Sequence, residues 1–405
     1  GDHSCWWIPG DYDSYEYLYN NSKLSEIDLT PFNYETRGDR NLPNKRAVNT
    51  PITMETSEGL FLSFHEANLT DYAGLTLEAN DDLTLKVDLV PWSDGTKVKT
   101  KVPFKTPWRT IQISNSAQDL IASNLILNLN EPNKLDDITW IEPMKYIGIW
   151  WEMHFGKSSW SMNPIDGSWA NNSKNHGATT LNAKYYIDFA AKNNIKGVLI
   201  EGWNTGWEYW GADTLDYFDF VIPYADFDIQ GVVKYANDNG VEIIGHHETG
   251  GQAENYEKHL ENAFAFYNEL GIRAVKTGYA GQIIPKGEYH HGQYMVRHYR
   301  KVLETAAKYR IMLDAHEPIA ATGLRRTYPN MMTREGVRGM EYNAWSDGNP
   351  PEHTTIIPFT RMLSGPIDYT PGIFDLTFDE YKDKERVQTT LAKQLAYYVI
   401  IYSPM

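Results

Sequence analysis

The chain has 405 residues, a length that suggests two or three domains. Its 37 Lys and Arg against 53 Asp and Glu give a net charge of −16, which argues against nucleic acid as a partner, because duplex affinity depends on basic side chains that neutralise phosphates. No apolar stretch approaches the roughly 20 residues of a membrane-spanning helix, and the single cysteine, Cys5, excludes an internal disulfide and a cysteine-based metal site.

From residue 6 to about residue 143 the sequence is typical of strands. Segments at 59–64, 75–78, 83–89 and 110–114 alternate apolar with polar residues, the period of half-buried strands. We therefore expect an antiparallel sheet or sandwich over residues 1–143. The stretch 117–126 fits a short helix as well as a strand.

From residue 145 onward short apolar runs alternate with longer amphipathic stretches. Eight strands separated mostly by helices predict a (β/α)8 barrel over residues 144–405. The competing open, doubly wound sheet usually has a Gly-rich phosphate loop after its first strand, and none is present here. The predicted strands are 146–150, 197–200, 241–245, 273–276, 311–314, 337–340, 355–359 and 366–369, and the predicted helices are 181–193, 229–239, 252–270, 289–309 and 386–403.

Aromatic residues are abundant. Thirteen Trp, 27 Tyr and 14 Phe make up 13% of the chain, more than core filling demands. Flat apolar rings beside many carboxylates suit sugars, whose C–H faces stack and whose hydroxyls form hydrogen bonds. The composition therefore favours carbohydrate as the ligand.

Ionisable and aromatic side chains follow the ends of five consecutive predicted strands. In a barrel the active site lies at the carboxyl ends of the strands, so these side chains should share one rim. A single rim Glu is usually solvated and a single His usually bonds a backbone carbonyl, but five strand ends in succession indicate a site. The rim residues are Glu201, Trp203 and Asn204; His246, His247 and Glu248; Lys276 and Tyr279; Asp314, His316 and Glu317; and Glu341 and Trp345.

Three chemistries use such residues: glycoside hydrolysis by two carboxyl groups, metal-assisted hydrolysis, and proton abstraction from a sugar. The excess of Glu over His favours a hard cation such as calcium over zinc. Glu317, Glu335 and Glu341 lie within 25 residues of one another and could bind calcium together with an acidic group from the first region. Glu335 alone is equally typical of an acid at a helix start.

Several motifs on this rim occur together in one known family. They are Glu-Gly-Trp-Asn at 201–204, His-His-Glu-Thr-Gly at 246–250 and a long, distinctive block from 315 to 343, with shorter motifs at 6–9 and 64–67. On these residues the sequence resembles glycoside hydrolase family 97 over essentially its whole length.

The resemblance implies a calcium-dependent, exo-acting α-glycosidase with an N-terminal β-super-sandwich, a catalytic barrel and a small C-terminal β-domain. Against that plan we expect the chain to begin inside the sandwich and to end before the C-terminal domain. The family also implies a periplasmic or secreted bacterial protein. The chain opens with Gly-Asp-His, so any secretion signal would have been removed or not supplied.

The resemblance also implies a mechanism. Retaining members carry an aspartate nucleophile just after the Val-Lys pair of the fourth strand, where this chain has Thr277 and Gly278. We therefore expect the inverting α-glucosidase branch, in which Glu248 and Glu317 activate a water and Glu341 is the general acid.

The remaining site residues follow from the same resemblance. Calcium would be bound by Glu66, Glu317, Glu335 and Glu341, with Glu66 the least secure ligand because it rests on a short motif. The sugar of an oligosaccharide or α-glycoside substrate would be bound by His246, His316, Lys276 and Glu201, although Lys276 could instead form a salt bridge with Glu201 or Glu248.

Two alternatives stay open. The same residues could act on another sugar, such as galactose, because one or two side chains distinguish the two hydroxyl orientations at C4. The barrel could also belong to a carbohydrate-binding protein without hydrolytic activity.

Overall fold

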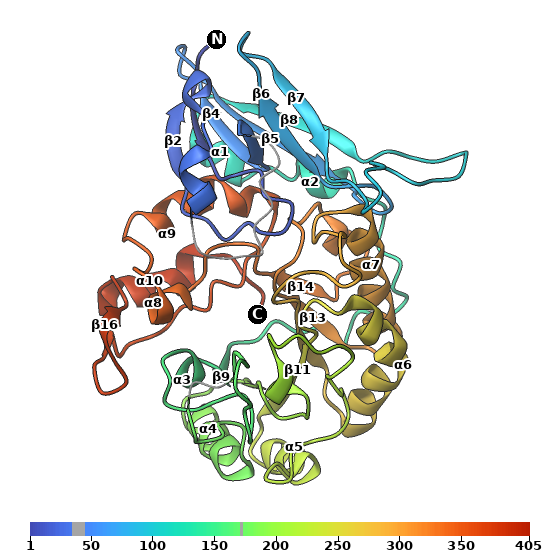
Figure 1. Cartoon of the computed structure of the whole chain (residues 1–405), viewed down its shortest axis with the longest axis vertical. Coiled ribbons are helices and arrows are strands. Elements are labelled where there is room, and N and C mark those ends of the chain that lie inside the picture. The colour runs from blue at the N-terminus through green and yellow to red at the C-terminus, as the bar shows by residue number, and fades with distance from the viewer. Residues whose placement is uncertain (35–44, 171–172) are drawn as a thin grey trace.

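The computed structural model describes residues 1–34, 45–170 and 173–405. An antiparallel β region, blue and cyan at the top of Figure 1, precedes a parallel α/β barrel that runs from green to red below it. This architecture confirms the predicted fold class. The boundary between residues 143 and 144 stays a prediction, although the antiparallel strands end at Ser114 and the parallel strands begin at Tyr146.

The described part of the first region contains eight strands, and the undecided stretch 117–126 contains one short helix and the start of a second. The strands are β1 Ser4–Trp7, β2 Asn20–Lys23, β3 Ala47–Asn49, β4 Ile52–Glu55, β5 Phe61–Ala67, β6 Leu75–Ala79, β7 Leu85–Leu89 and β8 Trp108–Ser114; the helices are the 3-10 turns η1 Leu24–Glu26 and η2 Thr30–Tyr34, α1 Ala117–Ile121 and α2 Leu125–Asn128.

These strands form two sheets. The order in the larger sheet is β2-β1-β4-β5-β8, and in the smaller β3-β6-β7. Their inner faces share one buried cluster that includes Trp7 and Met54 from the first sheet and Leu77 from the second. Two sheets packed over one apolar core make a sandwich.

Burial in β8 is the reverse of the usual amphipathic pattern. Ile111 and Ile113 are 56% and 66% exposed, whereas the polar Thr110 and Gln112 are buried. Gln112 and Thr110 lie opposite Ser63 and His65 of β5, and the ring of His65 bonds the carbonyl of Ala321 in the barrel. The polar face of β8 therefore lies toward the barrel, while the three-stranded second sheet does not cover the isoleucines.

The second region begins with six parallel strands in the order β14-β13-β12-β11-β10-β9. Helices pack against this sheet from outside; α7, for example, buries Met295, Val302 and Leu303, each of which contributes about 1.5–3 kcal/mol. The strands are β9 Tyr146–Ile149, β10 Gly197–Ile200, β11 Glu242–Glu248, β12 Ala274–Gly278, β13 Met312–Ala315, β14 Met331–Arg334, β15 Thr377–Phe378 and β16 Lys382–Arg386; the helices are α3 Trp151–His154, α4 Thr180–Lys192, α5 Ile229–Asp238, α6 Ala253–Leu270, α7 Gln293–Lys308, α8 Tyr342–Trp345, α9 His353–Ile356 and α10 Leu391–Ile400, with 3-10 turns η3 Trp207–Tyr209, η4 Leu324–Arg326, η5 Ile357–Phe359 and η6 Arg361–Ser364.

Three of the predicted strands are corrected by the structure. The sixth strand is β14, not 337–340, which forms a loop; 355–359 is helical; and 366–369 forms only a single bridge, between Ile367 and Arg334. The barrel closes through the end of the chain, because Ile367 N donates to Tyr402 O (3.1 Å) and Met144 N donates to Pro404 O (3.0 Å). Residues 402–404 thus connect the segment at Ile367, which takes the place of the seventh barrel strand, to the residues just before the first strand, β9.

Among the helices that the structure describes, none combines the length and the apolar character needed to cross a membrane.

Candidate active site

The interior of the barrel changes from apolar to polar along each strand. Side chains two residues apart lie on the same face of a strand. One inward-facing residue from each of β10–β13 belongs to an apolar cluster in the barrel interior. The residue two positions later in the sequence is polar and buried in each case. These pairs are Leu199 and Glu201, Ile244 and His246, Ala274 and Lys276, and Met312 and Asp314.

The strand register brings the polar residues to one level, where Lys276 pairs with His246 on one side and Asp314 on the other. Lys276 Nζ donates to Glu201 Oε1 (2.6 Å), and Trp160 Nε1 donates to Glu201 Oε2 (2.8 Å). Glu201, His246 and Lys276 form the floor cluster of the site, and the alternative pairing of Lys276 with Glu201 is present.

The floor cluster holds opposite charges away from water. Burial raises the pKa of Glu201, but the Lys276 charge, together with the hydrogen bonds from Lys276 and Trp160, outweighs burial and lowers this pKa to about 2. The same pairing keeps the pKa of Lys276 above its ordinary value despite burial. Burial lowers the pKa of His246 to about 3, so its ring is neutral, and its Nδ1 has no hydrogen-bond partner among the described residues.

Glu248 ends β11, two residues beyond His246, and lies opposite Gly278 in the register. Its Oε1 accepts hydrogen bonds from three backbone amides, those of Thr249 (3.0 Å), Gly250 (2.7 Å) and Ala280 (3.2 Å). Burial nevertheless raises the pKa of Glu248 to about 7. A Cβ at residue 278 would collide with Glu248 Oε2, so the glycine provides the space that this carboxylate occupies.

Glu317 lies just beyond the end of β13 and has a positive φ of 46°. A non-glycine residue in this region is strained, and such strain clusters at functional sites. The amide of Tyr279 donates to Glu317 Oε2 (2.7 Å). Burial, and then the charges of Glu248 and Glu335, raise the pKa of Glu317 well above its ordinary value.

Glu341 precedes α8, and its Oε2 lies 3.5 Å from His154 Nε2. Burial lowers the pKa of His154 to about 3, so this ring is neutral. Trp345, one helical turn further along, lines the same cavity as Glu341.

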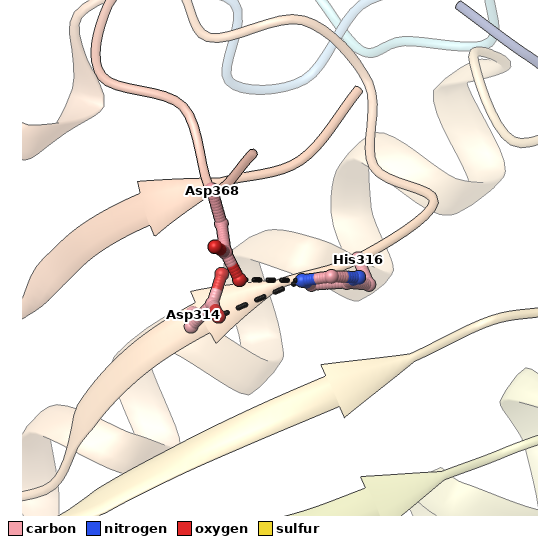
Figure 2. Close-up of side chains that lie close together, drawn as sticks. All are labelled: Asp314, His316 and Asp368. Atoms are coloured by element: carbon pink, nitrogen blue, oxygen red, sulfur yellow. Dashed lines mark hydrogen bonds and ion pairs between the residues drawn. The ribbon is translucent and has the colours of Figure 1, made fainter. Parts of the chain in front are cut away.

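His316 has carboxylates near both of its ring nitrogens, and Figure 2 shows the two on the Nε2 side, Asp314 and Asp368. Its Nε2 is 2.8 Å from Asp368 Oδ2 and 3.6 Å from Asp314 Oδ2, while its Nδ1 is 3.3 Å from Glu335 Oε2. Burial opposes a charge on this ring, but Glu335 and Asp314 raise the pKa of His316 well above its ordinary value. No sequence pattern pointed to Asp368, which follows the single-bridge residue Ile367.

Two groups of metal-ligating side chains occur in the described parts of the chain, with their donor atoms within 4.8 Å of one another: Asp314, His316 and Asp368, and His316, Glu317 and Glu335. The second group contains two of the four predicted calcium ligands. Glu66 belongs to neither group; it pairs with Arg109 and accepts a hydrogen bond from the amide of Leu75 (3.3 Å).

The site opens into a cavity of about 1360 Å³. It is lined by the floor cluster and by the predicted residues Glu248, His316, Glu317 and Glu341, whereas Glu66 and Glu335 are not among the lining residues that the structure describes. The sandwich contributes Asp13 and Glu16 to the lining. No sequence pattern pointed to these two, because they lie far from the barrel strands in the sequence. Six tryptophans complete the aromatic part of the lining: Trp150, Trp160, Trp169, Trp207, Trp210 and Trp345.

A barrel with buried carboxylates and histidines around a cavity at the carboxyl ends of its strands is the architecture of a barrel enzyme. Comparison with known proteins identifies the group. The family model described as Glycosyl-hydrolase 97 N-terminal matches residues 1–132, and the model described as Glycoside hydrolase 97 matches residues 150–337. The chain belongs to glycoside hydrolase family 97.

A family 97 enzyme from Pseudoalteromonas sp. strain K8, solved in complex with acarbose, is 47% identical with a TM-score of 0.87; the match covers 100% of this chain and 59% of that one. A variant of that enzyme was solved with panose. A β-arabinopyranosidase with 16% identity and a TM-score of 0.71 covers 100% of this chain and 60% of its own, and shares the fold alone.

Two curated relatives are less similar. The retaining α-galactosidase of Bacteroides thetaiotaomicron is 27% identical over 98% of this chain and 57% of its own length. A probable retaining α-galactosidase of Streptomyces bingchenggensis is 26% identical over 69% of this chain and 38% of its own. The chain thus spans less than two thirds of the length of these relatives.

Proposed function

We propose that this chain carries the active site of an inverting, exo-acting α-glucosidase that removes terminal glucose from α-glucosides. The observation that carries the proposal is at residue 278. The place where the retaining branch is expected to have its nucleophile is glycine, and the carboxylate of Glu248 fills the space that a side chain would need.

The roles follow from this arrangement. Without a carboxylate on β12, the attacking group is a water activated by Glu248 and Glu317. The high pKa of Glu248, about 7, makes it an effective base near neutral pH. Glu341 lines the same cavity and protonates the departing oxygen as general acid. Inversion requires the acid and the base to be far enough apart for a water between sugar and base.

The floor cluster binds the terminal sugar. Glu201 and Lys276 offer charged acceptor and donor atoms, and the Nδ1 of His246, which has no partner among the described residues, can bond a hydroxyl. Glucose as that sugar is supported by the relative with 47% identity, which was solved with acarbose and, as a variant, with panose, a trisaccharide of α-linked glucose.

Calcium fits the residues present. Glu317 and Glu335 offer oxygen ligands of the kind calcium prefers. Burial, the charge of Glu248 and then that of Glu335 raise the pKa of Glu317, and a cation would relieve the repulsion among these carboxylates. When bound, calcium would fix the orientation of Glu317 and polarise the leaving-group side of the site. We propose Glu341 as the third calcium ligand from the barrel.

For the ligand from the sandwich we propose Glu16 as an alternative to Glu66. Glu16 lines the cavity, contributes to the raised pKa of Glu317, and accepts a hydrogen bond from Tyr342, the neighbour of Glu341 (2.6 Å). Glu66 is buried against Arg109 instead.

The second candidate function is that of a retaining α-galactosidase, which the names of both curated relatives favour. Under that reading another carboxylate of the cavity, such as Glu201 or Glu248, would be the nucleophile. A carbohydrate-binding protein without activity is the third possibility.

One experiment separates these candidates. Proton NMR during the first minutes of α-glucoside hydrolysis should show the β-anomer before mutarotation mixes the forms. The α-anomer first would contradict inversion, and faster cleavage of 4-nitrophenyl α-galactoside than of the α-glucoside would contradict the glucose specificity. No release from either compound would favour a binding protein. We further propose a periplasmic or secreted location, which fractionation of the producing bacterium would test.

A further inference from the structure

Trp169 is a half-exposed tryptophan in the cavity lining. It belongs to the segment between α3 and α4, and it is 50% exposed, whereas Trp207 in the same cavity is 1% exposed. A large aromatic ring left open at a cavity needs an explanation, because burying it elsewhere would stabilise the fold.

The indole of Trp169 lies against two glycines. A Cβ at Gly211 would collide with the ring, so this glycine makes room for it, whereas a Cβ at Gly281 would lie in ordinary contact at 3.4 Å. Both have positive φ, 76° and 99°, a conformation that other residues rarely adopt. Trp169 N also donates to Trp210 O (2.8 Å).

An aromatic series connects Trp169 to the floor cluster. Trp169 meets Trp210 edge to face at 5.4 Å, Trp210 meets Trp160 in the same way at 5.2 Å, and Trp160 donates to Glu201. The exposed indole therefore lies at the outer end of a series whose inner end touches the residues that we assign to the terminal sugar.

We propose that Trp169 is a stacking surface for the sugar that follows the scissile bond, so that it selects oligosaccharides over α-glucosides with a small leaving group. The inference rests on the proposed function. The deep, charged floor takes the terminal sugar, and the remainder of the substrate must extend toward the open part of the cavity. There the C–H face of a sugar ring can cover an aromatic ring that is already held in place.

The test compares two substrates of one enzyme. Maltotriose has sugars after the scissile bond, whereas α-glucosyl fluoride has only fluoride there. Trp169→Ala should lower kcat/KM for maltotriose about tenfold and leave that for the fluoride within twofold, and Trp169→Phe should restore most of the loss. Trp108→Ala is the matched control, because Trp108 is 55% exposed on β8 and is not among the described residues that line the cavity.

Equal losses on both substrates, or no loss on maltotriose, would overturn the proposal. If the protein hydrolyses neither substrate, the proposed function fails but the inference is still tested by calorimetry. Trp169→Ala should then weaken maltotriose binding about tenfold and leave glucose binding unchanged, and absence of maltotriose binding to the unmodified protein would overturn both.

Discussion

Residue 278 decides how much room the Glu248 carboxylate has. Its backbone φ is outside the left-handed region, so glycine is needed there for space and not for conformation. Lack of a carboxylate at 278 is evident from the sequence, but the use of that space by Glu248 is not, because it depends on the register of β11 against β12.

A double-mutant cycle measures this contact. Gly278→Ala should destabilise the protein by about 1–3 kcal/mol, the usual cost of overpacking, because the new methyl group and Glu248 Oε2 claim the same space. In a Glu248→Ala background the same change should cost less than about 0.5 kcal/mol, since coupling is confined to residues in contact. Urea unfolding of the four proteins provides the values, and equal costs in both backgrounds would refute the overlap.

Glu248 should also make stability depend on pH. Its pKa is raised in the folded protein from 4.5 to about 7, so the folded state binds the proton more tightly than the unfolded state. The stability that the protonated group contributes is therefore complete below pH 4.5 and is lost as the pH rises through about 7, by at most about 3 kcal/mol.

Melting temperatures at pH 5 and pH 8, measured with a chelator present, test the sign. Relative to Glu248→Gln, which cannot ionise, the unmodified protein should lose several degrees between the two values. The exposed Glu254→Gln on α6 is the control and should follow the unmodified protein. A difference independent of pH would place the Glu248 pKa near its ordinary value.

At the scale of elements, β9–β13 were predictable and the rest of the barrel only in part. The first five apolar runs are flanked by helices long enough to show their period. The sequence predicts the sixth strand at 337–340 instead of at 331–334 because both segments are short and only pairing with β13 selects β14. The seventh and eighth strand positions of the barrel have too few backbone hydrogen bonds to impose an alternation of apolar and polar residues. The sequence therefore predicts a strand at 355–359, which is helical, and gives no signal at 402–404.

Asp368 illustrates what such a short element contributes. It accepts hydrogen bonds from His316 Nε2 (2.8 Å), Tyr146 Oη (2.9 Å) and the amide of Thr370 (3.1 Å). Despite its burial, the bond and charge of His316 hold the pKa of Asp368 below its ordinary value. Asp368→Asn should lower stability by about 1.5–3 kcal/mol, the contribution of a charge-assisted hydrogen bond, and should lower the pKa of His316 in an NMR titration.

The exposed Asp375→Asn, seven residues along the chain, is the matched control and should change stability by less than about 0.5 kcal/mol. An unchanged His316 titration in Asp368→Asn would show that Asp314 and Glu335 alone hold the imidazole.

At the scale of the whole molecule, the cavity is shared by the sandwich and the barrel. Rim residues of the barrel could be predicted from one rule, the location of active sites at strand ends. Asp13 and Glu16 follow no such rule, because their proximity to Glu317 and His290 arises only when the two regions pack.

Calcium should therefore stabilise the molecule as a whole. Binding to the folded state alone raises stability by mass action, so adding calcium after chelation should raise the melting temperature and restore activity. If Glu16 is the ligand from the sandwich, Glu16→Gln should abolish most of this rise and Glu66→Gln should preserve it. The opposite ranking would return the role to Glu66, and a melting temperature indifferent to calcium would contradict a calcium site.

The shared cavity has a consequence for how such proteins recombine. Asp13 and Glu16 belong to one region, and His290 and Tyr342, which they contact, belong to the other. In a chimera that joins the sandwich of one relative to the barrel of another, the two residues of each contact would come from different parents. This holds even when the crossover lies between the two regions. We expect inheritance of activity to follow the 11–16 segment, so the unit exchanged must include this segment together with the barrel.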